Sequence, residues 1–414
     1  MSVLIRGNAA SAAKVSKGSG KKDKDVTSSF QNSAFSKHFW VLTAAALNVF
    51  VLYSPQPLLP LFAHLYGLTE SSSALLMAVT MLPLAIAPLS YGYLLSYIPP
   101  IRVLRLSLII LALLTLLTGL AQSFPQLLVV RFVQGLFIPA SLTAVMAFLA
   151  YSGKESELQQ SMSLYVAATI SGGFLGRLLA GVSSVIVDWR IFYFMLAALM
   201  CACFFMIRPV DTVGQKTEKQ LSAVADISSF LKVRPCLPVY LAIFCLFFVF
   251  CGTLNFLPFR TVELTGYRSG MLTGIMYCGY ITGIVTSMGA GKIIRQAGSE
   301  ARVMISGYIL FLLILACMLV PHTWLLFILL FPFCGAMFLV HTVATAVVNR
   351  KAGQHRGLAS GFYVSSYYSG GVFGMYIPGL IFERYGWNGM VAGLVVFGML
   401  GIVMLSVFFR NRMT

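Results

Sequence analysis

Two stretches of the sequence, SGGFLGRLLAG at residues 171–181 and SGGVFGMYIPG at residues 369–379, carry nearly the same pattern of glycines. Each is followed eight residues later by a tryptophan, Trp189 in the first case and Trp387 in the second. At the same offset of 198 residues, the Leu-Pro pair at 59–60 matches the Leu-Pro pair at 257–258. Because one register holds over two separate segments, we predict that the chain is a duplication of a single unit.

The composition predicts that this unit lies in a membrane. Of the 414 residues, 58% are hydrophobic and only 10% are charged, whereas soluble domains are about 25% charged. A membrane-spanning helix needs about 20 apolar residues, and the sequence holds twelve such runs, six in each half. We therefore predict an all-α integral membrane protein with twelve transmembrane helices in two six-helix repeats. The predicted spans cover residues 39–60, 73–96, 103–121, 126–149, 161–185, 191–207, 237–257, 270–290, 303–320, 324–348, 358–382 and 390–409.

Polar segments divide the chain into four predicted parts. Residues 1–37 form a basic, low-complexity tail that we expect to be disordered and cytoplasmic. Residues 38–208 form the first six-helix bundle and residues 236–414 form the second. Between them, residues 209–235 form a polar cytoplasmic loop.

The distribution of basic residues predicts the orientation of the spans. If the amino terminus is cytoplasmic, 23 of the 29 Lys and Arg residues face the cytoplasm and only four face outward, which is the bias that membrane proteins show. The net charge of +17 is explained by this bias, so it does not indicate a nucleic-acid-binding protein. Both termini are therefore predicted to be cytoplasmic.

Three motifs resemble the major facilitator superfamily. RFVQG at residues 131–135 is similar to the Arg-x-x-Gln-Gly signature that this family carries in its fourth span. YSPQPLLP at residues 53–60 and GGFLGR at residues 172–177 are similar to motifs of a bacterial subgroup of drug/proton antiporter type. The resemblance covers residues 40–410. It implies two parallel six-helix repeats with substrate bound between them near the middle of the membrane.

The residues inside the predicted spans indicate which substrates suit the protein. Arg131, Arg177 and His341 lie within spans, while all twelve Asp and Glu residues lie outside them. A charge at a helix centre costs about 2.5 to 3.5 kcal/mol on insertion scales, so two such arginines favour an anionic or neutral substrate. We predict that Arg131 and Arg177 form a positive outer vestibule. The alternatives are that Arg131 only bonds backbone carbonyls and that Arg177 snorkels to the surface.

His341 is the intramembrane side chain of the type that titrates near neutral pH, so it is the candidate proton carrier. The alternative is a histidine whose hydrogen bonds are satisfied in the core. Four uncharged polar or aromatic residues are candidate substrate contacts, with interhelical hydrogen bonding or packing as the alternative: Tyr53, Gln56, Gln134 and Asn255.

Glycines at helical spacings of three and four form a stripe without side chains on each repeated span. The resemblance implies that the fifth and eleventh spans pack across the two halves, against the eighth and second spans. We therefore predict that the stripes form the seam on which the halves rock; the alternative is static packing. The stripes consist of Gly172, Gly173 and Gly176, and of Gly370, Gly371 and Gly374.

These features together predict a secondary active transporter that exports a small organic molecule by alternating access with proton exchange. We expect a monomer in the bacterial inner membrane, with the small molecule, protons and the lipid bilayer as its partners and with no nucleic acid. The sequence has no ATP-binding GxxxxGK[ST] motif and no clustered catalytic or metal-ligating residues, so we predict no enzyme activity, cofactor or metal. Two alternatives stay open: a facilitator or importer without proton coupling, and a sensor or binding protein that keeps the transporter fold.

Overall fold

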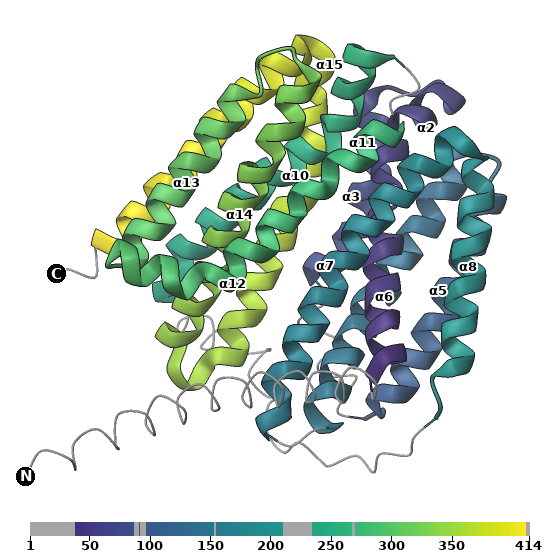
Figure 1. The fold of residues 1–414 in the computed structure, drawn as a ribbon, viewed down its shortest axis with the longest axis horizontal. Helices are drawn as coiled ribbons and strands as arrows, with labels where there is room; N and C mark the ends of the chain where they lie inside the picture. The colour runs from purple at the N-terminus through teal and green to yellow at the C-terminus, as the bar shows by residue number, and fades with distance from the viewer. Residues whose placement is uncertain are drawn as a thin grey trace, which may run out of the picture.

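A computed structural model describes residues 38–86, 91, 97–152, 155–209, 234–266 and 270–410 of the chain. The predicted tail at residues 1–37 and nearly all of the predicted loop at residues 209–235 lie outside the described residues. Every regular element among the described residues is a helix, and short connections join the helices. Figure 1 shows two bundles side by side, one from the first half of the chain and one from the second.

The first bundle, here the N half, begins with a helix at residues 38–53. The remaining elements of the N half are η1 (Gln56–Leu58), α2 (Leu59–Tyr66), α3 (Glu70–Ile86), α5 (Pro100–Leu120), α6 (Phe124–Ser152), α7 (Glu155–Ile186) and α8 (Trp189–Met206). The second bundle, the C half, consists of η3 (Arg234–Cys236), α10 (Leu237–Thr265), α11 (Gly270–Met276), η5 (Tyr277–Gly279), α12 (Tyr280–Ala297), α13 (Glu300–Cys317), α14 (Thr323–Ala352), η6 (Gly353–His355) and α15 (Arg356–Arg410).

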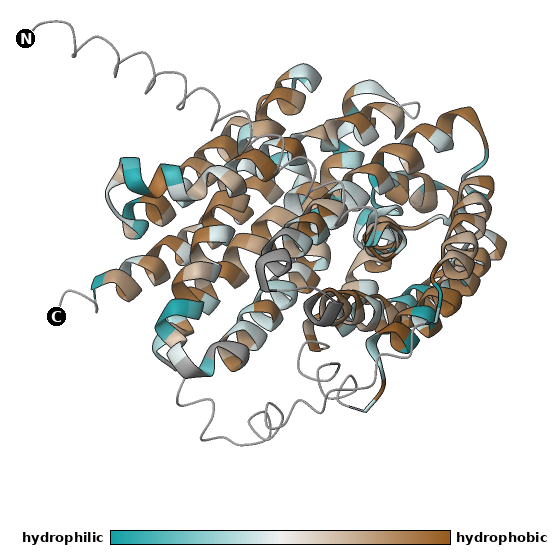
Figure 2. Ribbon diagram, turned by 60° about the horizontal axis from the view of Figure 1, so that its bottom comes forward, coloured by the Kyte–Doolittle hydropathy of each residue, from teal (hydrophilic) through white to brown (hydrophobic). Residues whose placement is uncertain are grey.

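The helices account for the twelve predicted spans. Among the described residues, ten helical segments are long and apolar enough to cross a membrane. One of them, Leu358–Arg410, contains two predicted spans, because the backbone at Gly386 leaves the helical region with φ 65° and ψ −170°, a conformation open mainly to glycine. The remaining span is α3, an apolar helix of 17 described residues. Figure 2 shows hydrophobic residues along most of the helices, with hydrophilic residues mainly at their ends.

The first and seventh spans lie at the centre of the molecule. Within the most apolar window of each span, 67% of the residues are buried in His38–Tyr66 and 78% in Leu237–Thr265, against 33% in Ser161–Ile186. The central position of these two spans makes their polar residues the first place to look for a site between the halves.

Five of the six striped glycines have their nearest neighbours in their own half, so the stripes do not form the seam between the halves, which corrects that prediction. A Cβ atom added at Gly172 would lie 2.8 Å from the Cα atom of Ala46, and one added at Gly176 would lie 2.6 Å from the carbonyl oxygen of Phe50, both in the first helix. Gly370 and Gly374 meet Phe244 and Phe248 of α10 in the same way. Gly173 faces residues of its own half, and only Gly371 also approaches the other half, at the Met81 sulfur. The stripes therefore bring the first and fifth spans of each half together.

Candidate functional site

The two halves meet at a polar contact between the first and seventh spans. Gln56 Nε2 donates a hydrogen bond to Asn255 Oδ1 at 3.4 Å, and both side chains are buried. The two residues are 199 positions apart, one more than the repeat offset of 198, so they occupy nearly equivalent places in the two halves. Residues related by a two-fold axis can touch only close to that axis. The contact therefore marks the centre of the interface between the halves.

The fifth span of each half joins this contact. Arg177 Nε donates to Gln56 Oε1 at 2.6 Å, and Asn255 Nδ2 donates to the backbone oxygen of Met375 at 3.0 Å. Arg177 and Met375 are themselves equivalent at the offset of 198. In each half, the first span is thus hydrogen-bonded to the fifth span at an equivalent position. Only the N half has a charged side chain at this position.

Arg177 reaches across the interface and stays buried, with 1% of its surface exposed. Its Nη1 donates to the Gly173 carbonyl at 2.9 Å and its Nη2 donates to the Tyr280 hydroxyl of the C half at 3.1 Å. The guanidinium carbon lies 3.8 Å from the ring centroid of Tyr53, 4.7 Å from that of Tyr280 and 5.0 Å from that of Tyr277. Aromatic faces and neutral acceptors therefore stabilise this cation. It does not extend to the surface, as the snorkelling alternative required.

No carboxylate balances this charge among the described residues. The salt bridges found there are Arg260–Glu263 and Arg350–Glu300, and neither includes Arg177. A buried cation without a counter-ion is costly, because the interior replaces the hydration shell only in part. The site therefore carries a net positive charge at the contact between the halves.

Arg131 and Gln134 belong to a different structure, inside the N half. Arg131 donates to the carbonyls of Val51 at 3.0 Å and Leu52 at 2.7 Å, and to Gln134 Oε1 at 2.8 Å. The first helix breaks here because Pro55 has no N–H to offer the Val51 carbonyl. With 1% of Arg131 exposed and Gln134 fully buried, the pair ties the fourth span to the broken first span. The predicted outer vestibule of two arginines is therefore not present in this arrangement.

His341 lies in the C half and connects to the interface through aromatic rings. Its Nδ1 is 2.9 Å from the hydroxyl of Tyr363, and its ring centroid is 4.6 Å from that of Tyr367. Tyr367 stacks on Phe247 with ring centroids 3.6 Å apart. Phe250 lies between Phe247 and Tyr280, with centroid distances of 6.1 and 5.8 Å. His341, Tyr367 and Tyr53 are each only half-buried. A series of aromatic rings therefore leads from the histidine to Tyr280, which accepts a hydrogen bond from Arg177.

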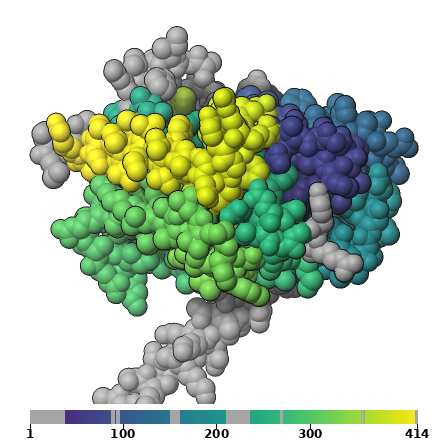
Figure 3. All heavy atoms as spheres, turned by 90° about the horizontal axis from the view of Figure 1, so that it is seen from above, coloured from purple at the N-terminus to yellow at the C-terminus, as the bar shows by residue number. Residues whose placement is uncertain are grey.

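Two close approaches between the halves lie beyond Arg177, toward the connection between α7 and α8. Following the predicted topology, we call this end of the molecule outer. A Cβ atom at Gly181 of α7 would lie 3.1 Å from the Cα atom of Gly274 in α11, and one at Gly379 of α15 would lie 2.8 Å from the Cβ atom of Ser71 in α3. Figure 3, viewed onto this end, shows yellow residues of α15 against purple residues of the N half.

Sequence reasoning missed Tyr280, Gly181 and Gly379 as residues that join the halves. Tyr280 follows Tyr277 by three positions, a helical spacing that would have placed both hydroxyls on one face. Gly181 and Gly379 are equivalent in the repeat and stand at the ends of the two quoted stretches.

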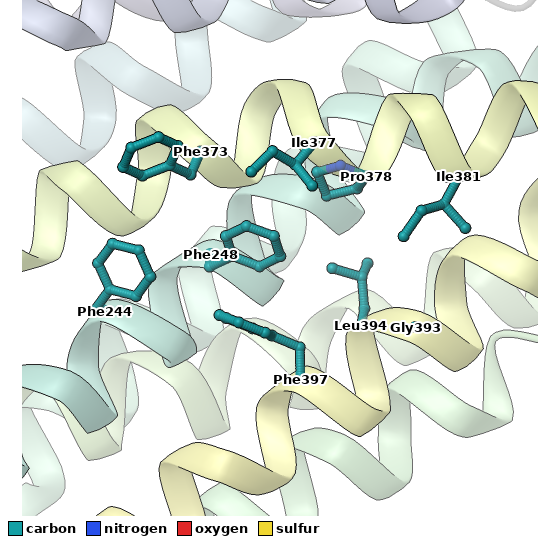
Figure 4. A pocket seen from close by; sticks show the side chains of 9 residues that line it. All are labelled: Phe244, Phe248, Phe373, Ile377, Pro378, Ile381, Gly393, Leu394 and Phe397. Atoms are coloured by element: carbon teal, nitrogen blue, oxygen red, sulfur yellow. The ribbon is translucent and has the colours of Figure 1, made fainter.

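An apolar cavity lies within the C half, between α10 and α15. It has a volume of about 340 Å³ and is lined only by apolar residues of α10 and α15 (Figure 4). The lining residues are Phe244, Phe248, Phe373, Ile377, Pro378, Ile381, Gly393, Leu394 and Phe397. Without a polar group in its lining, it does not suit a charged solute.

Comparison with known proteins identifies the family of the chain. The Major Facilitator Superfamily model matches residues 41–339 and 298–414. The inner membrane transport protein YnfM of Escherichia coli is 28% identical over 359 residues, which are 85% of each chain. The multidrug resistance protein MdtG of Salmonella arizonae is 26% identical over 86% of this chain and 90% of its own. The crystal structure of the nucleoside transporter NupG superposes with a TM-score of 0.74 at 13% identity, covering 89% of this chain and 98% of that one. The chain is a multi-pass membrane transporter and belongs to the Major Facilitator Superfamily.

Proposed function

We propose that this transporter exports a small organic anion or neutral molecule by alternating access, with Arg177 at the outer end of the path. The observation that carries the proposal is the buried guanidinium of Arg177, which has no carboxylate partner among the described residues and bridges the two halves. A site with a net positive charge favours an anion over a cation. Export is consistent with the printed name of MdtG, a relative of 26% identity.

Cargo binding and gating would share the same groups. The contacts of Gln56 with Asn255 and of Arg177 with Tyr280 join the halves. Opening of the outer side separates Tyr280 from Arg177 and leaves a guanidinium N–H without its acceptor. An anionic group of the cargo then takes that donor, so that cargo and Tyr280 alternate at one position. The tyrosines around Arg177 provide the apolar faces for the rest of the molecule.

Proton exchange is assigned to His341 within this proposal, with Tyr363 as its hydrogen-bond partner. Arginine keeps its proton, and the acidic residues lie outside the predicted spans, so the histidine is the group available for proton transfer. We also propose that the protein is a monomer with both termini cytoplasmic. A location in a bacterial inner membrane is in line with the printed name of YnfM.

The test begins with the purified protein and a library of carboxylates, phosphates, sulfonates and neutral solutes. Solutes that raise its thermal stability are then used, in labelled form, for counterflow in proteoliposomes. We expect anions among the stabilising solutes. Arg177→Gln should weaken their binding affinity by about 10- to 150-fold, the value of a hydrogen bond to a charged group. Arg190→Gln is the matched control, because it removes one positive charge from the outer end of α8, away from the contact between the halves.

The outcomes separate the proposal from its alternatives. Normal binding and counterflow of an anion by Arg177→Gln would contradict the role of Arg177. Solutes that bind without counterflow would support a sensor, and counterflow without accumulation in a pH gradient would support a facilitator.

A further inference from the structure

We propose that Glu383 is a latch that holds the outer ends of the two halves together by capping a helix of the opposite half. Glu383 lies in α15 of the C half, next to the break at Gly386. Its Oε1 accepts a hydrogen bond from the backbone N–H of Ser71 at 2.9 Å, in the first turn of α3. The contact therefore joins the eleventh span to the second.

The first turn of α3 is capped from both halves. The Thr69 hydroxyl, from the same half as α3, accepts from the Ser72 N–H at 3.3 Å. Glu383, from the other half, accepts from the Ser71 N–H. The first N–H groups of a helix have no partner within it and are normally satisfied by a side chain close by in sequence. Here one of them is satisfied by a residue 312 positions away.

The charge of Glu383 strengthens this cap. A carboxylate at a helix N-terminus gains from the aligned peptide dipoles as well as from the hydrogen bond. Gly379, one helical turn before Glu383, permits the approach, because a Cβ atom there would lie 2.9 Å from the Cα atom of Ser71. At the crossing of α15 and α3, the absence of a side chain at Gly379 therefore allows the close approach, and the carboxylate of Glu383 forms the hydrogen bond.

The latch favours the arrangement in which the outer side is closed. Separation of α15 from α3 leaves Glu383 and the Ser71 N–H to water, so the free energy of the cap is lost only when the outer side opens. Neutralising Glu383 therefore shifts the equilibrium toward the outward-open arrangement. For an exposed cap the expected shift is about two- to tenfold. This inference rests on the alternating access proposed above.

The experiment measures distances across the outer end by pulsed electron paramagnetic resonance. Spin labels are placed on Leu65 of α2 and Trp324 of α14, both exposed, in a background without native cysteines. Glu383→Gln keeps an acceptor oxygen but removes the charge, and Glu383→Ala removes both. Glu70→Gln is the matched control, since it removes the same charge from the first turn of α3 without changing a contact between the halves.

We expect the fraction of molecules with longer distances between the two labels to increase from wild type to Glu383→Gln and again to Glu383→Ala. The distance distribution of Glu70→Gln should match that of wild type. Unchanged distributions in both Glu383 variants would overturn the latch, as would an equal shift in Glu70→Gln. If cargo alters the distances but Glu383 does not, alternating access stands and only the latch fails. If the outer ends stay together in every variant and with cargo, both proposals fail.

Discussion

Replacing Gly379 by alanine should push the outer ends of the two halves apart. The added Cβ atom would lie 2.8 Å from the Cβ atom and 2.9 Å from the Cα atom of Ser71 in the other half. Carbon atoms in contact are normally about 3.5 to 4.0 Å apart, so α15 and α3 must separate by roughly 0.6 Å or more. Overpacking of this kind costs about 1 to 3 kcal/mol. The Cβ atom would also lie 2.6 Å from Phe256 Cζ in the same half, and that part of the cost is present in both arrangements. The part that comes from Ser71 exists only when the outer side is closed, so it weighs against that arrangement.

The expected result is a shift of about 5- to 30-fold toward the outward-open arrangement, the equivalent of about 1 to 2 kcal/mol from the contact with Ser71. The distance between labels at Leu65 and Trp324 measures it. Gly374→Ala is the matched control on the same helix, because its Cβ atom would lie 2.7 Å from the Cα atom of Phe248, within the C half. Gly374→Ala should lower thermal stability and leave the distances as they are. If Gly379→Ala leaves the distances unchanged, or if Gly374→Ala shifts them equally, the assignment of the seam is refuted.

Three further predictions follow from the site. His341→Asn keeps a polar side chain that cannot titrate, so accumulation driven by a pH gradient should be lost while counterflow is retained; unchanged accumulation would remove His341 from the mechanism. Arg131→Met removes the side-chain donor of the Leu52 carbonyl and leaves the Val51 carbonyl only the Ser54 hydroxyl, and should lower the free energy of unfolding in detergent by about 2 to 4 kcal/mol; an unchanged value would argue against the structural role of Arg131. A cysteine placed at Gln215, in the predicted cytoplasmic loop, should not react with an impermeant reagent in intact cells, and a reaction would reverse the predicted topology.

The fold could be predicted from the sequence because its signals are local or repeated. Runs of apolar residues fix the spans, and the glycine pattern at an offset of 198 identifies the two halves. Gly386 ends a span with a positive φ angle that only the structure reveals, yet hydropathy alone already separates the two spans around it.

The roles within the site were harder to predict, because the type of residue does not say which partner it meets. Arg131 and Arg177 look alike in sequence, but the break at Pro55 lets Arg131 bind two backbone carbonyls of the first span, whereas Arg177 meets tyrosines of the other half. The glycine stripes were assigned to the wrong neighbours for a related reason. A stripe predicts a close approach, but Gly172 and Gly176 face the first helix of their own half, and only Gly181, further along α7, reaches the C half.

The most direct test of alternating access is to lock the outer ends together. A Cβ atom added at Gly270 of α11 would lie 2.5 Å from the Ser184 Oγ of α7, so cysteines at these two positions place their Cβ atoms within the roughly 3.5 to 4.5 Å range that a disulfide needs. In a background without native cysteines, the disulfide is verified by cleaving the loop at residues 209–235 and finding the halves still joined. We predict that oxidation stops counterflow in proteoliposomes and that a reducing agent restores it. Full counterflow with the disulfide formed would contradict the account.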